Sequence, residues 1–520
     1  MFDVLFTGAT VVDGTGAGRT VTDVAVAGDR IALVGPAPEG ATARRVVDCA
    51  GACLAPGFID VHTHADHLPF VDPAMGSALR QGVTSVVVGN CGDSLWPPGE
   101  PDTFGPFLAE LGPGLCRSWG SFGDYLDAID ACRSGANVAS LVGHGSVRAH
   151  VLESERREAD AGEVRAMRAH VRDALADGAV GLSSGLIYQP GLFADTDELV
   201  GVASAVAECG GLYTSHIRGE GSTLFRAVAE AVEVGRRAGA HVHISHLKLA
   251  AAGVWHRAAE LLGFIHDAGA TADQYPYTAG LTDLASLLPP WAPADRFDEL
   301  RADRARLTRL QESVEHGEPD WVGAAEGVGW DHLVPVGPVG EGEDSPSLAV
   351  LARERGETPV ETMLDLLDED REMLVLIHAM QADDVRAIMR DPDVMVASDS
   401  IPAPDDERWS SLRDHPRSYG TFPRVLGHYA RDEGVLPLEA AVRKMTSLPA
   451  ERFGLRDRGR VAQGSFADLT LFDPDEIAGG GDFLRPHAAP RGIRLVLVNG
   501  RVAWDGTTCT RADRALRRTT

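Results

Sequence analysis

Six side chains of the types that bind metal ions stand at the ends of short apolar segments of this chain. His62 and His64 alternate with Thr63 at the end of the segment 57–64, so both imidazoles project to one side of an extended backbone. The other four end later segments of the same kind: Cys91, His216, His246 and Asp399. Core residues would be mostly aliphatic and scattered along such segments. Because imidazole, thiolate and carboxylate are the ligands that Zn²⁺ takes from proteins, the pattern predicts a metal site.

Cys91 and Asp399 could each have an ordinary structural role, but the presence of the other candidate ligands makes that role a less complete explanation. A single buried cysteine is usually a small apolar filler, but Cys91 lies in GNCGD, between glycines that let the backbone turn and approach closely. Asp399 in ASDS could be an ordinary helix N-cap. That role is compatible with chemistry and does not account for the other five side chains. Most remaining histidines, His67 among them, fall on predicted helices, loops or tails and are expected at the surface.

The element pattern predicts a fold that would bring these segment ends together. Between residues 57 and 450, short apolar runs alternate with longer stretches rich in Ala, Arg and Glu, which is typical of repeated βα units and a parallel sheet. The strand candidates are 57–64, 83–91, 137–144, 179–185, 211–216, 241–246, 270–275, 372–378 and 394–399. Nine candidates for eight places indicate a (β/α)₈ barrel of the TIM type with one surplus strand, which we assign to 372–378. The carboxyl ends of barrel strands form the catalytic face.

The two ends of the chain predict a second, smaller domain. Residues 1–56 and 456–508 read as β-segments broken by glycine, which favours a small β-sandwich assembled from both termini, with the barrel at 57–455. Residues 281–350 are rich in Pro, Gly and acidic residues and are expected to form an insertion over the active-site mouth. Residues 509–520 are expected to be a frayed tail.

Composition limits the partners and the compartment. The hydrophobic fraction of 44% and charged fraction of 24% are those of a globular protein. The net charge of −28 repels nucleic acids and anionic membrane surfaces, so the expected partner is a small molecule. Seven dispersed cysteines indicate a reducing compartment. With no signal-peptide pattern and no apolar run of membrane-spanning length, we expect a cytoplasmic protein.

The ordered motifs of the chain resemble those of the metal-dependent amidohydrolases, and within them the N-acyl-D-amino-acid deacylases, also called D-aminoacylases. The resemblance runs through GFIDVHTHAD, GNCG, LVGHGSVR, GLSSGLIYQPG, YTSHIRGEG, ISHLKLA, DQYPYTAG, ASDS, HPRSYGTFPR and GSFADLTLFDP. It implies a (β/α)₈ barrel with a small β-sandwich and zinc at the strand ends. By this resemblance Cys91, His216 and His246 hold one tight zinc. A second, weaker position is formed by His62, His64, Cys91 and Asp399.

The scarcity of lysine tests one feature of the wider superfamily. Many barrel amidohydrolases bridge two metals with a carboxylated lysine, but this chain has only Lys248 and Lys444. Lys444 lies near the end of the predicted barrel, Lys248 follows His246 by two residues, and the fourth strand candidate, 179–185, has no lysine. In the deacylase group a cysteine takes the bridging part, and it corresponds to Cys91.

The ligand set predicts amide hydrolysis. A bound Zn²⁺ lowers the pKa of its water to about 7 and polarises an amide carbonyl, and Asp399 would carry the proton from water to the leaving amine. Lys248 shares the strand parity of His246 and is expected to bind a substrate carboxylate. Tyr188, Tyr277 and Arg218 are further candidates for substrate binding, with packing or scaffold roles as the alternative. The roles of four more residues stay open: His144, His378, His415 and Arg417.

The leading hypothesis is zinc-dependent hydrolysis of N-acyl-D-amino acids to a carboxylate and a free D-amino acid. Apolar residues in 281–291 suggest substrates with hydrophobic side chains. One alternative is a cyclic-amide hydrolase resembling hydantoinases and dihydroorotases, against which the missing bridging lysine counts. The other is a non-catalytic barrel scaffold, which should have lost ligand residues. The acyl group, the strictness of the D preference, the number of working metals and the oligomeric state are left open.

Overall fold

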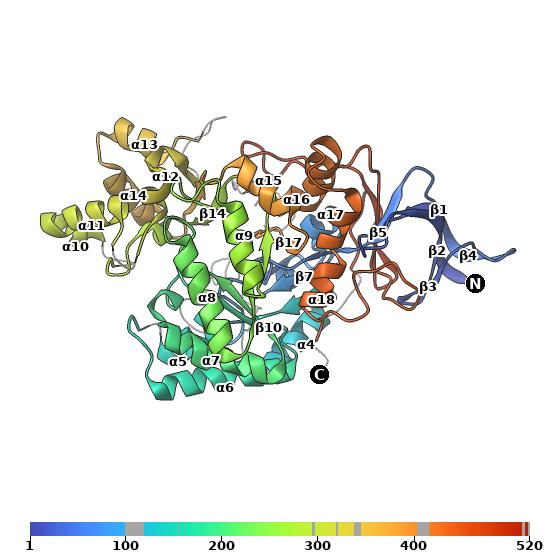
Figure 1. Ribbon diagram of the computed structural model, residues 1–520, viewed down its shortest axis with the longest axis horizontal. Coiled ribbons are helices and arrows are strands. Elements are labelled where there is room, and N and C mark those ends of the chain that lie inside the picture. The colour runs from blue at the N-terminus through green and yellow to red at the C-terminus, as the bar shows by residue number, and fades with distance from the viewer. Residues whose placement is uncertain are drawn as a thin grey trace.

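The computed structural model describes most of the chain, and its strands fall into a sheet from the two chain ends, a parallel set and a small antiparallel sheet (Figure 1). The described residues are 1–98, 119–153, 155–293, 297–318, 321–336, 345–402, 415–511 and 515–517. No helix among them is long and apolar enough to cross a membrane.

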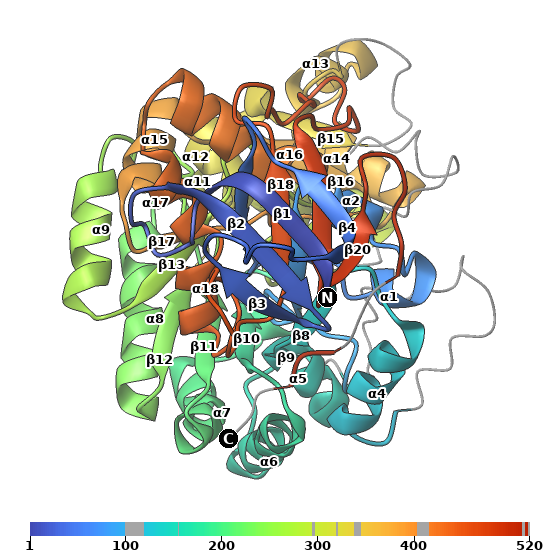
Figure 2. The same ribbon diagram turned by 90° about the vertical axis from the view of Figure 1, so that its right-hand side faces the viewer.

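Both chain ends contribute to one sheet, which lies on the right of Figure 1 and faces the viewer in Figure 2. Its order is β20-β19-β18-β5-β1-β2-β3, with β4 paired to β1. The junction of the two ends is the antiparallel pair β5 and β18, in register from Leu469↔Pro56 to Phe472↔Cys53. One face buries an aliphatic cluster that includes Phe6, Val24 and Leu497. The sheet strands are β1 (Phe2–Val11), β2 (Thr20–Ala27), β3 (Arg30–Val34), β4 (Ala43–Asp48), β5 (Cys53–Pro56), β18 (Leu469–Phe472), β19 (Ile493–Val498) and β20 (Arg501–Trp504).

The parallel strands occupy the middle of the chain and form two sheets, β6-β7-β8 and β9-β10-β11-β12-β13-β17. They are buried on both faces, as the continuous Val-rich run of β7 leads us to expect. The backbone also links the sheets to each other. The N–H of Val180, just before β10, donates to the Ser140 carbonyl of β8 at 3.0 Å, and the N–H of His64 donates to the Ser400 carbonyl at 2.7 Å. The strands are β6 (Phe58–Asp60), β7 (Val83–Val88), β8 (Asn137–Ser140), β9 (Val142–Gly143), β10 (Gly181–Gly185), β11 (Leu212–His216), β12 (His241–Ile244), β13 (Thr271–Gln274) and β17 (Val394–Val396).

Amphipathic helices connect the parallel strands and surround them (Figure 2). The sequence defines their ends: α6 begins with a capping box of Asp160 and Glu163 and ends at Gly178, and α8 buries one stripe that includes Leu224, Val228 and Val234. These helices are α1 (Leu68–Val71), α2 (Gly76–Leu79), α4 (Phe122–Cys132), α5 (His144–Leu152), α6 (Ala161–Asp177), η1 (Gly191–Phe193), α7 (Thr196–Cys209), α8 (Leu224–Ala238), α9 (Ala258–Asp267), α15 (Ala382–Arg390), α16 (Arg417–Arg424), η4 (Val425–Asp432), α17 (Leu438–Lys444) and α18 (Ser447–Arg452).

The surplus strand is β16 (Leu374–Ile377), and the prediction that it lies outside the parallel set is confirmed. It pairs antiparallel with β14 (Gly280–Asp283) and β15 (Leu333–Val336) in a small sheet beside a helical group with its own apolar core, at the upper left of Figure 1. The predicted end of the insertion, residue 350, falls inside helix α13. The inserted group extends further, to β16, because both α14 and β16 bury residues in its apolar core. The group contains η2 (Leu284–Leu287), α10 (Phe297–Ala302), α11 (Arg304–His316), α12 (Ala324–Val328), η3 (Trp330–His332), α13 (Leu348–Arg355) and α14 (Pro359–Glu369).

The prediction of a frayed C-terminal tail is wrong for its described residues. Ala515 is 6% exposed, and the N–H of Leu516 donates to the Val138 carbonyl of β8 at 2.7 Å. Arg517 pairs with Asp127 of α4 at 2.5 Å. The basic composition suggested a solvated end, whereas the tail is attached to acidic side chains and a strand that lie far away in the sequence.

Candidate metal centre

The six side chains singled out in the sequence lie at or just beyond the carboxyl ends of the parallel strands. His62 and His64 follow β6, Cys91 follows β7, and Asp399 follows β17, while His216 ends β11 and His246 lies just past β12. Three of these residues have left-handed backbone: φ is 53° at Cys91, 36° at His246 and 51° at Asp399. Such a conformation costs an L-residue about 1–2 kcal/mol. Strain of this kind is characteristic of functional sites, where the fold uses it to aim side chains.

The ligand atoms of these side chains form two groups that share one sulfur. Cys91, His216 and His246 make one group, and His62, His64, Cys91 and Asp399 make the other, with the ligand atoms of each group within 4.8 Å of one another. In the first group the Cys91 Sγ lies 3.5 Å from His246 Nε2, which lies 2.8 Å from His216 Nδ1. In the second, Cys91 Sγ lies 3.3 Å from His62 Nε2. The structure therefore brings the six side chains together in the two predicted groups.

Burial and charge at this point fit a bound cation. Cys91, His216, His246 and Asp399 are each no more than 6% exposed. Burial opposes ionisation of the Cys91 thiol, but the His62 and His246 imidazoles beside it, when protonated in the metal-free site, hold its pKa well below the usual range. A thiolate is thus available as a ligand. The ring nitrogens of His216 and His246 that face each other across 2.8 Å would both offer lone pairs to one ion between them and the sulfur.

Asp273, which was not among the predicted residues, supports the ligand side chains His62 and His246. The residue is 1% exposed. One carboxylate oxygen faces His62 Nδ1 at 3.4 Å and accepts from His243 Nε2 at 2.8 Å, and the other accepts the backbone N–H of His246 at 2.9 Å. Bonding at Nδ1 turns the His62 Nε2 toward Cys91, as carboxylate partners of metal-binding histidines do. The available signal was an acidic residue in the middle of the predicted strand 270–275, where a buried carboxylate needs a partner.

Lys248 points at the group as predicted, but it already has an acidic partner. Its ammonium, on a residue 8% exposed, lies 2.5 Å from Glu220 Oε1 and 2.8 Å from His246 Nδ1. Glu220 was not among the predicted residues. The position of Glu220 four residues after His216, in YTSHIRGEG, was the feature of the sequence that could have indicated a role near the site.

The Arg417 guanidinium, whose role the sequence left open, bonds directly to Asp399. Its Nη1 donates to Asp399 Oδ2 at 2.6 Å, and its Nη2 donates to the Leu281 carbonyl of β14 at 3.2 Å. Burial opposes ionisation of Asp399, but the Arg417 guanidinium and His246 hold its pKa well below the usual range. His415 supports the arginine, since its Nδ1 accepts the Arg417 backbone N–H at 3.0 Å.

The other substrate-binding candidates differ in their surroundings. The Tyr188 ring packs edge-on against His216 at 5.0 Å between centroids, and its hydroxyl bonds to Thr282 Oγ1 at 2.9 Å. Tyr277 donates its hydroxyl to the Pro416 carbonyl at 3.1 Å. Arg218 makes contacts of the scaffold kind that was its alternative role: its guanidinium donates to Glu230 at 2.9 Å and to the carbonyls of Leu192 and Ala194, so it supports the loop after β10. The strand ends at His216, and beyond it the alternation of side chains no longer applies.

Three further histidines lie apart from the two ligand groups. His67 is fully buried, with Nε2 facing the Pro402 carbonyl at 3.1 Å, so its predicted surface position is wrong. His144 donates to the buried Glu198 at 2.9 Å. His378 packs against Phe483 with ring centroids 5.2 Å apart.

The segment 281–291 does not supply the expected apolar pocket. Leu284, Leu287 and Leu288 are buried in the core of the inserted group. The reason for expecting hydrophobic substrate side chains is therefore removed. Only the start of the segment lies beside the site, through the contacts of Leu281 with Arg417 and Thr282 with Tyr188.

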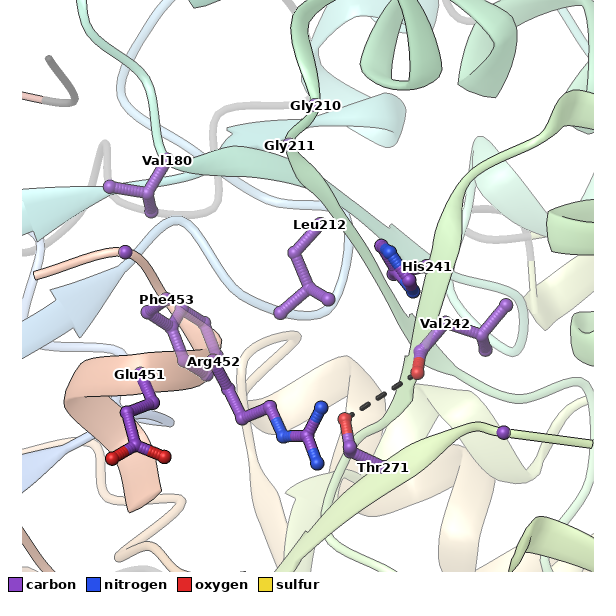
Figure 3. Close-up of a pocket in the computed structure, with 12 residues that line it drawn as sticks. Val180, Gly210, Gly211, Leu212, His241, Val242, Thr271, Glu451, Arg452 and Phe453 are labelled. Carbon is purple, nitrogen blue, oxygen red and sulfur yellow. Dashed lines mark hydrogen bonds between the residues drawn. The ribbon is translucent and has the colours of Figure 1, made fainter. Parts of the chain in front are cut away.

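A separate cavity of about 280 Å³ lies at the opposite ends of the strands (Figure 3). It is lined by the starts of β11, β12 and β13 and by α18, with Leu212, His241 and Thr271 on the strand side and Arg452 reaching toward Thr271. None of its lining residues belongs to the groups of metal-binding side chains found in the described parts of the chain. Chemistry is therefore expected at the other end of the strands.

Comparison with known proteins gives matches along the whole chain. The model of the amidohydrolase family matches residues 45–286 and 336–503. A D-aminoacylase of Alcaligenes xylosoxydans xylosoxydans is 38% identical over 524 residues, covering 100% of this chain and 98% of the relative. From the same organism, an N-acyl-D-glutamate deacylase is 38% identical over 96% of this chain and 93% of the relative, and an N-acyl-D-aspartate deacylase 36% identical over 97% and 92%.

Solved structures give the same result. A D-aminoacylase described with a binuclear metal centre has a TM-score of 0.82 and 37% identity, with 100% of both chains covered. An N-acyl-D-glutamate deacylase from Bordetella bronchiseptica, complexed with zinc and a phosphonate mimic of the tetrahedral intermediate, has a TM-score of 0.82 and 33% identity over 99% of both chains. An L-hydantoinase shares the fold at 16% identity and a TM-score of 0.54, which gives the cyclic-amide alternative no support beyond the fold.

Proposed function

We propose that this chain, which belongs to the amidohydrolase family and to its group of D-aminoacylases, hydrolyses N-acyl-D-amino acids to a carboxylate and a free D-amino acid. The observation that carries the proposal is the Cys91 sulfur shared by two groups of ligand atoms. Of the two lysines in the chain, Lys248 contacts Glu220 and the outer nitrogen of His246, away from the shared sulfur, and Lys444 bonds to the carbonyls of Met389 and Asp391. The carboxylated lysine of other amidohydrolases has no counterpart here. Deacylation of linear amides therefore fits the site better than cyclic-amide hydrolysis.

The architecture that we propose is a closed (β/α)₈ barrel. The links of Val180 to Ser140 and of His64 to Ser400 join the two parallel sheets at both seams, which supports a continuous ring from β6 to β17. The sheet from the two chain ends would be the small β-domain, and the inserted group would form one wall of the mouth. Contacts of Leu281 and Thr282 with Arg417 and Tyr188 support that last assignment.

We propose one tight zinc position at Cys91, His216 and His246, and a weaker one at His62, His64, Cys91 and Asp399. A zinc ion held there lowers the pKa of a bound water to about 7 and polarises an amide carbonyl. The tight group would offer a zinc ion two imidazoles and a thiolate, and three protein ligands are the number that catalytic zinc sites have.

Asp399 is the proposed proton carrier. Because its Oδ2 is held by Arg417, Oδ1 is the oxygen that faces the site, 3.4 Å from His62 Nε2 and 3.5 Å from His64 Nε2. Oδ1 would accept a proton from the attacking water and return it to the leaving nitrogen. The Arg417 contact keeps the carboxylate ionised before the reaction, so that it begins as a base.

Lys248 is the proposed partner of the substrate carboxylate. An ammonium has three N–H donors, and Glu220 uses one of them. The metal site would hold the scissile carbonyl of the substrate and Lys248 would hold its carboxylate. With these two groups fixed, the configuration of the α-carbon decides in which direction the substrate side chain points. Selection between D and L substrates follows from that geometry.

The test is a screen of paired N-acetyl-D- and N-acetyl-L-amino acids for released amine, with zinc-loaded and chelator-treated protein. We expect release from D substrates only, and loss of the activity with the metal. Ring opening of hydantoins or dihydroorotate to N-carbamoyl acids, followed by chromatography because no amine is released, would instead favour the cyclic-amide alternative. Bound zinc with turnover of neither class would overturn the proposal.

A further inference from the structure

We propose that Glu220 is a positioning residue, which uses one carboxylate oxygen to fix the ring of His246 for metal binding and to keep Lys248 from bonding to that ring. The inference deepens the proposed function and rests on its metal site. It concerns a residue outside both ligand groups.

The geometry places Glu220 Oε1 between the two side chains. It lies 3.0 Å from His246 Nδ1 and 2.5 Å from Lys248 Nζ, while the third distance of the triangle, between Nζ and Nδ1, is 2.8 Å. The Glu220 carbonyl also accepts the N–H of Ala250 at 2.9 Å. The loops after β11 and β12 are thus tied together by the same residue that contacts the ring.

The tautomer of His246 decides whether its ring can bind a metal. Nε2 faces Cys91 Sγ at 3.5 Å and His216 Nδ1 at 2.8 Å, so Nε2 must offer a lone pair and Nδ1 must carry the proton. A proton on Nδ1 needs an acceptor. Lys248 has only donors, which leaves Glu220 as the acceptor among the two groups that contact Nδ1.

Lys248 would favour the wrong tautomer if Glu220 did not hold it. An ammonium 2.8 Å from Nδ1 can donate to that nitrogen, and the ring would then carry its proton on Nε2, the atom that faces Cys91. The Glu220 carboxylate opposes that tautomer in two ways. It accepts the proton of Nδ1, and it attracts the Lys248 ammonium that would otherwise donate to Nδ1. Removal of the carboxylate should therefore weaken metal binding most when Lys248 is present.

The experiment compares the zinc affinity of four proteins by competition with a chelator: the wild type, Glu220→Gln, Glu220→Gln with Lys248→Met, and Glu260→Gln. Glu260 pairs with Arg257 on the surface at 2.7 Å and serves as the matched control. Carboxylate partners of metal-binding histidines typically contribute 10–100-fold to affinity. We expect Glu220→Gln to bind zinc 10–100-fold more weakly, the double variant to regain at least part of that loss, and Glu260→Gln to match the wild type.

Cobalt substitution gives a second readout that does not depend on turnover. The thiolate-to-cobalt absorption of the loaded wild type should decrease or shift in Glu220→Gln and return toward the wild type in the double variant. If Glu220→Gln does not fold, Glu220→Asp replaces it, because the shorter side chain withdraws the carboxylate oxygen from His246 Nδ1 and Lys248 Nζ, and the same order of affinities is expected.

Wild-type zinc affinity and cobalt spectrum in Glu220→Gln would overturn the inference, as would a double variant that binds no better than the single one. A wild type that holds zinc but hydrolyses no N-acyl-D-amino acid would instead overturn the proposed function, with the role of Glu220 still decided by the affinities. A wild type that holds no zinc would overturn both.

Discussion

Replacing Asp399 by Asn tests its proposed role as proton carrier separately from the proposed tight metal group. The substitution keeps the size of the side chain and removes its charge and its ability to accept a proton. Asp399 belongs to the second ligand group only, so Cys91, His216 and His246 are untouched. An amide oxygen can still accept from Arg417 Nη1, which now lies 2.6 Å from Oδ2.

We expect kcat to fall by about 10²–10⁴-fold, the usual contribution of a positioned acid and base. The tight zinc should remain, while any second zinc should be lost because the weaker position loses its only carboxylate. The assay is steady-state hydrolysis of N-acetyl-D-amino acids beside the zinc content of the same preparation. Circular dichroism and thermal melting check that the variant is folded.

Two results would refute this reasoning. A variant with kcat within tenfold of the wild type would show that Asp399 is not the proton carrier. A variant that loses all of its zinc would show that Asp399 is needed by the tight group, contrary to the division into two groups that the distances indicate.

Three further changes have separate expected outcomes. Cys91→Ala should abolish zinc retention and activity together, measured by zinc analysis and amine release, and retained activity would exclude a shared sulfur ligand. Lys248→Met should mainly raise KM for substrates with a free carboxylate, and equal kinetics for the acid and its methyl ester in wild type would exclude carboxylate binding. Neither Asp66 oxygen has a hydrogen-bond partner among the described residues, and burial raises the pKa of this carboxyl from 3.8 to about 8. The folded metal-free protein therefore binds a proton that the unfolded chain has released, so its stability should fall as pH rises from about 4 to about 8. Asp66→Asn should reduce that fall in urea unfolding at pH 5 and pH 8, whereas an unchanged slope would contradict it.

The sequence was sufficient to find the six clustered side chains because their signal is local, whereas their division into two groups came from the resemblance to the deacylases. Each of the six residues ends or follows an apolar run, and the parallel arrangement of such runs brings their carboxyl ends to one edge. The surplus strand could be identified for a similar reason. Nine candidates for eight places require one surplus, and 372–378 is the first run after the Pro- and Gly-rich segment.

The partners of these residues could not be predicted from single segments. Asp273 contacts His62 from 211 residues away, and Arg417 contacts Asp399 after the chain has returned from another loop. Strand parity also fails beyond the strand end. It placed Arg218 in the site, where the structure pairs it with Glu230, while the direction of Lys248, beyond the end of β12, is fixed by its contact with Glu220.

The inserted group and the tail show the same limit. Composition located the start of the insertion, but its end depends on antiparallel pairing of β14 with β16, strands more than 90 residues apart. The tail was assigned from its charge alone, and that charge is matched by Asp127 on a distant helix. Charge patterns in a sequence do not show which opposite charges lie nearby in space.

Zinc K-edge X-ray absorption of the wild-type protein loaded with one equivalent of zinc tests the metal centre most directly. With Cys91, His216 and His246 as ligands, the spectrum should contain one sulfur at about 2.3 Å together with nitrogen or oxygen ligands at about 2.0–2.1 Å. A spectrum fitted by nitrogen and oxygen ligands alone would contradict the account, because the sulfur of Cys91 would then lie outside the coordination sphere of the metal.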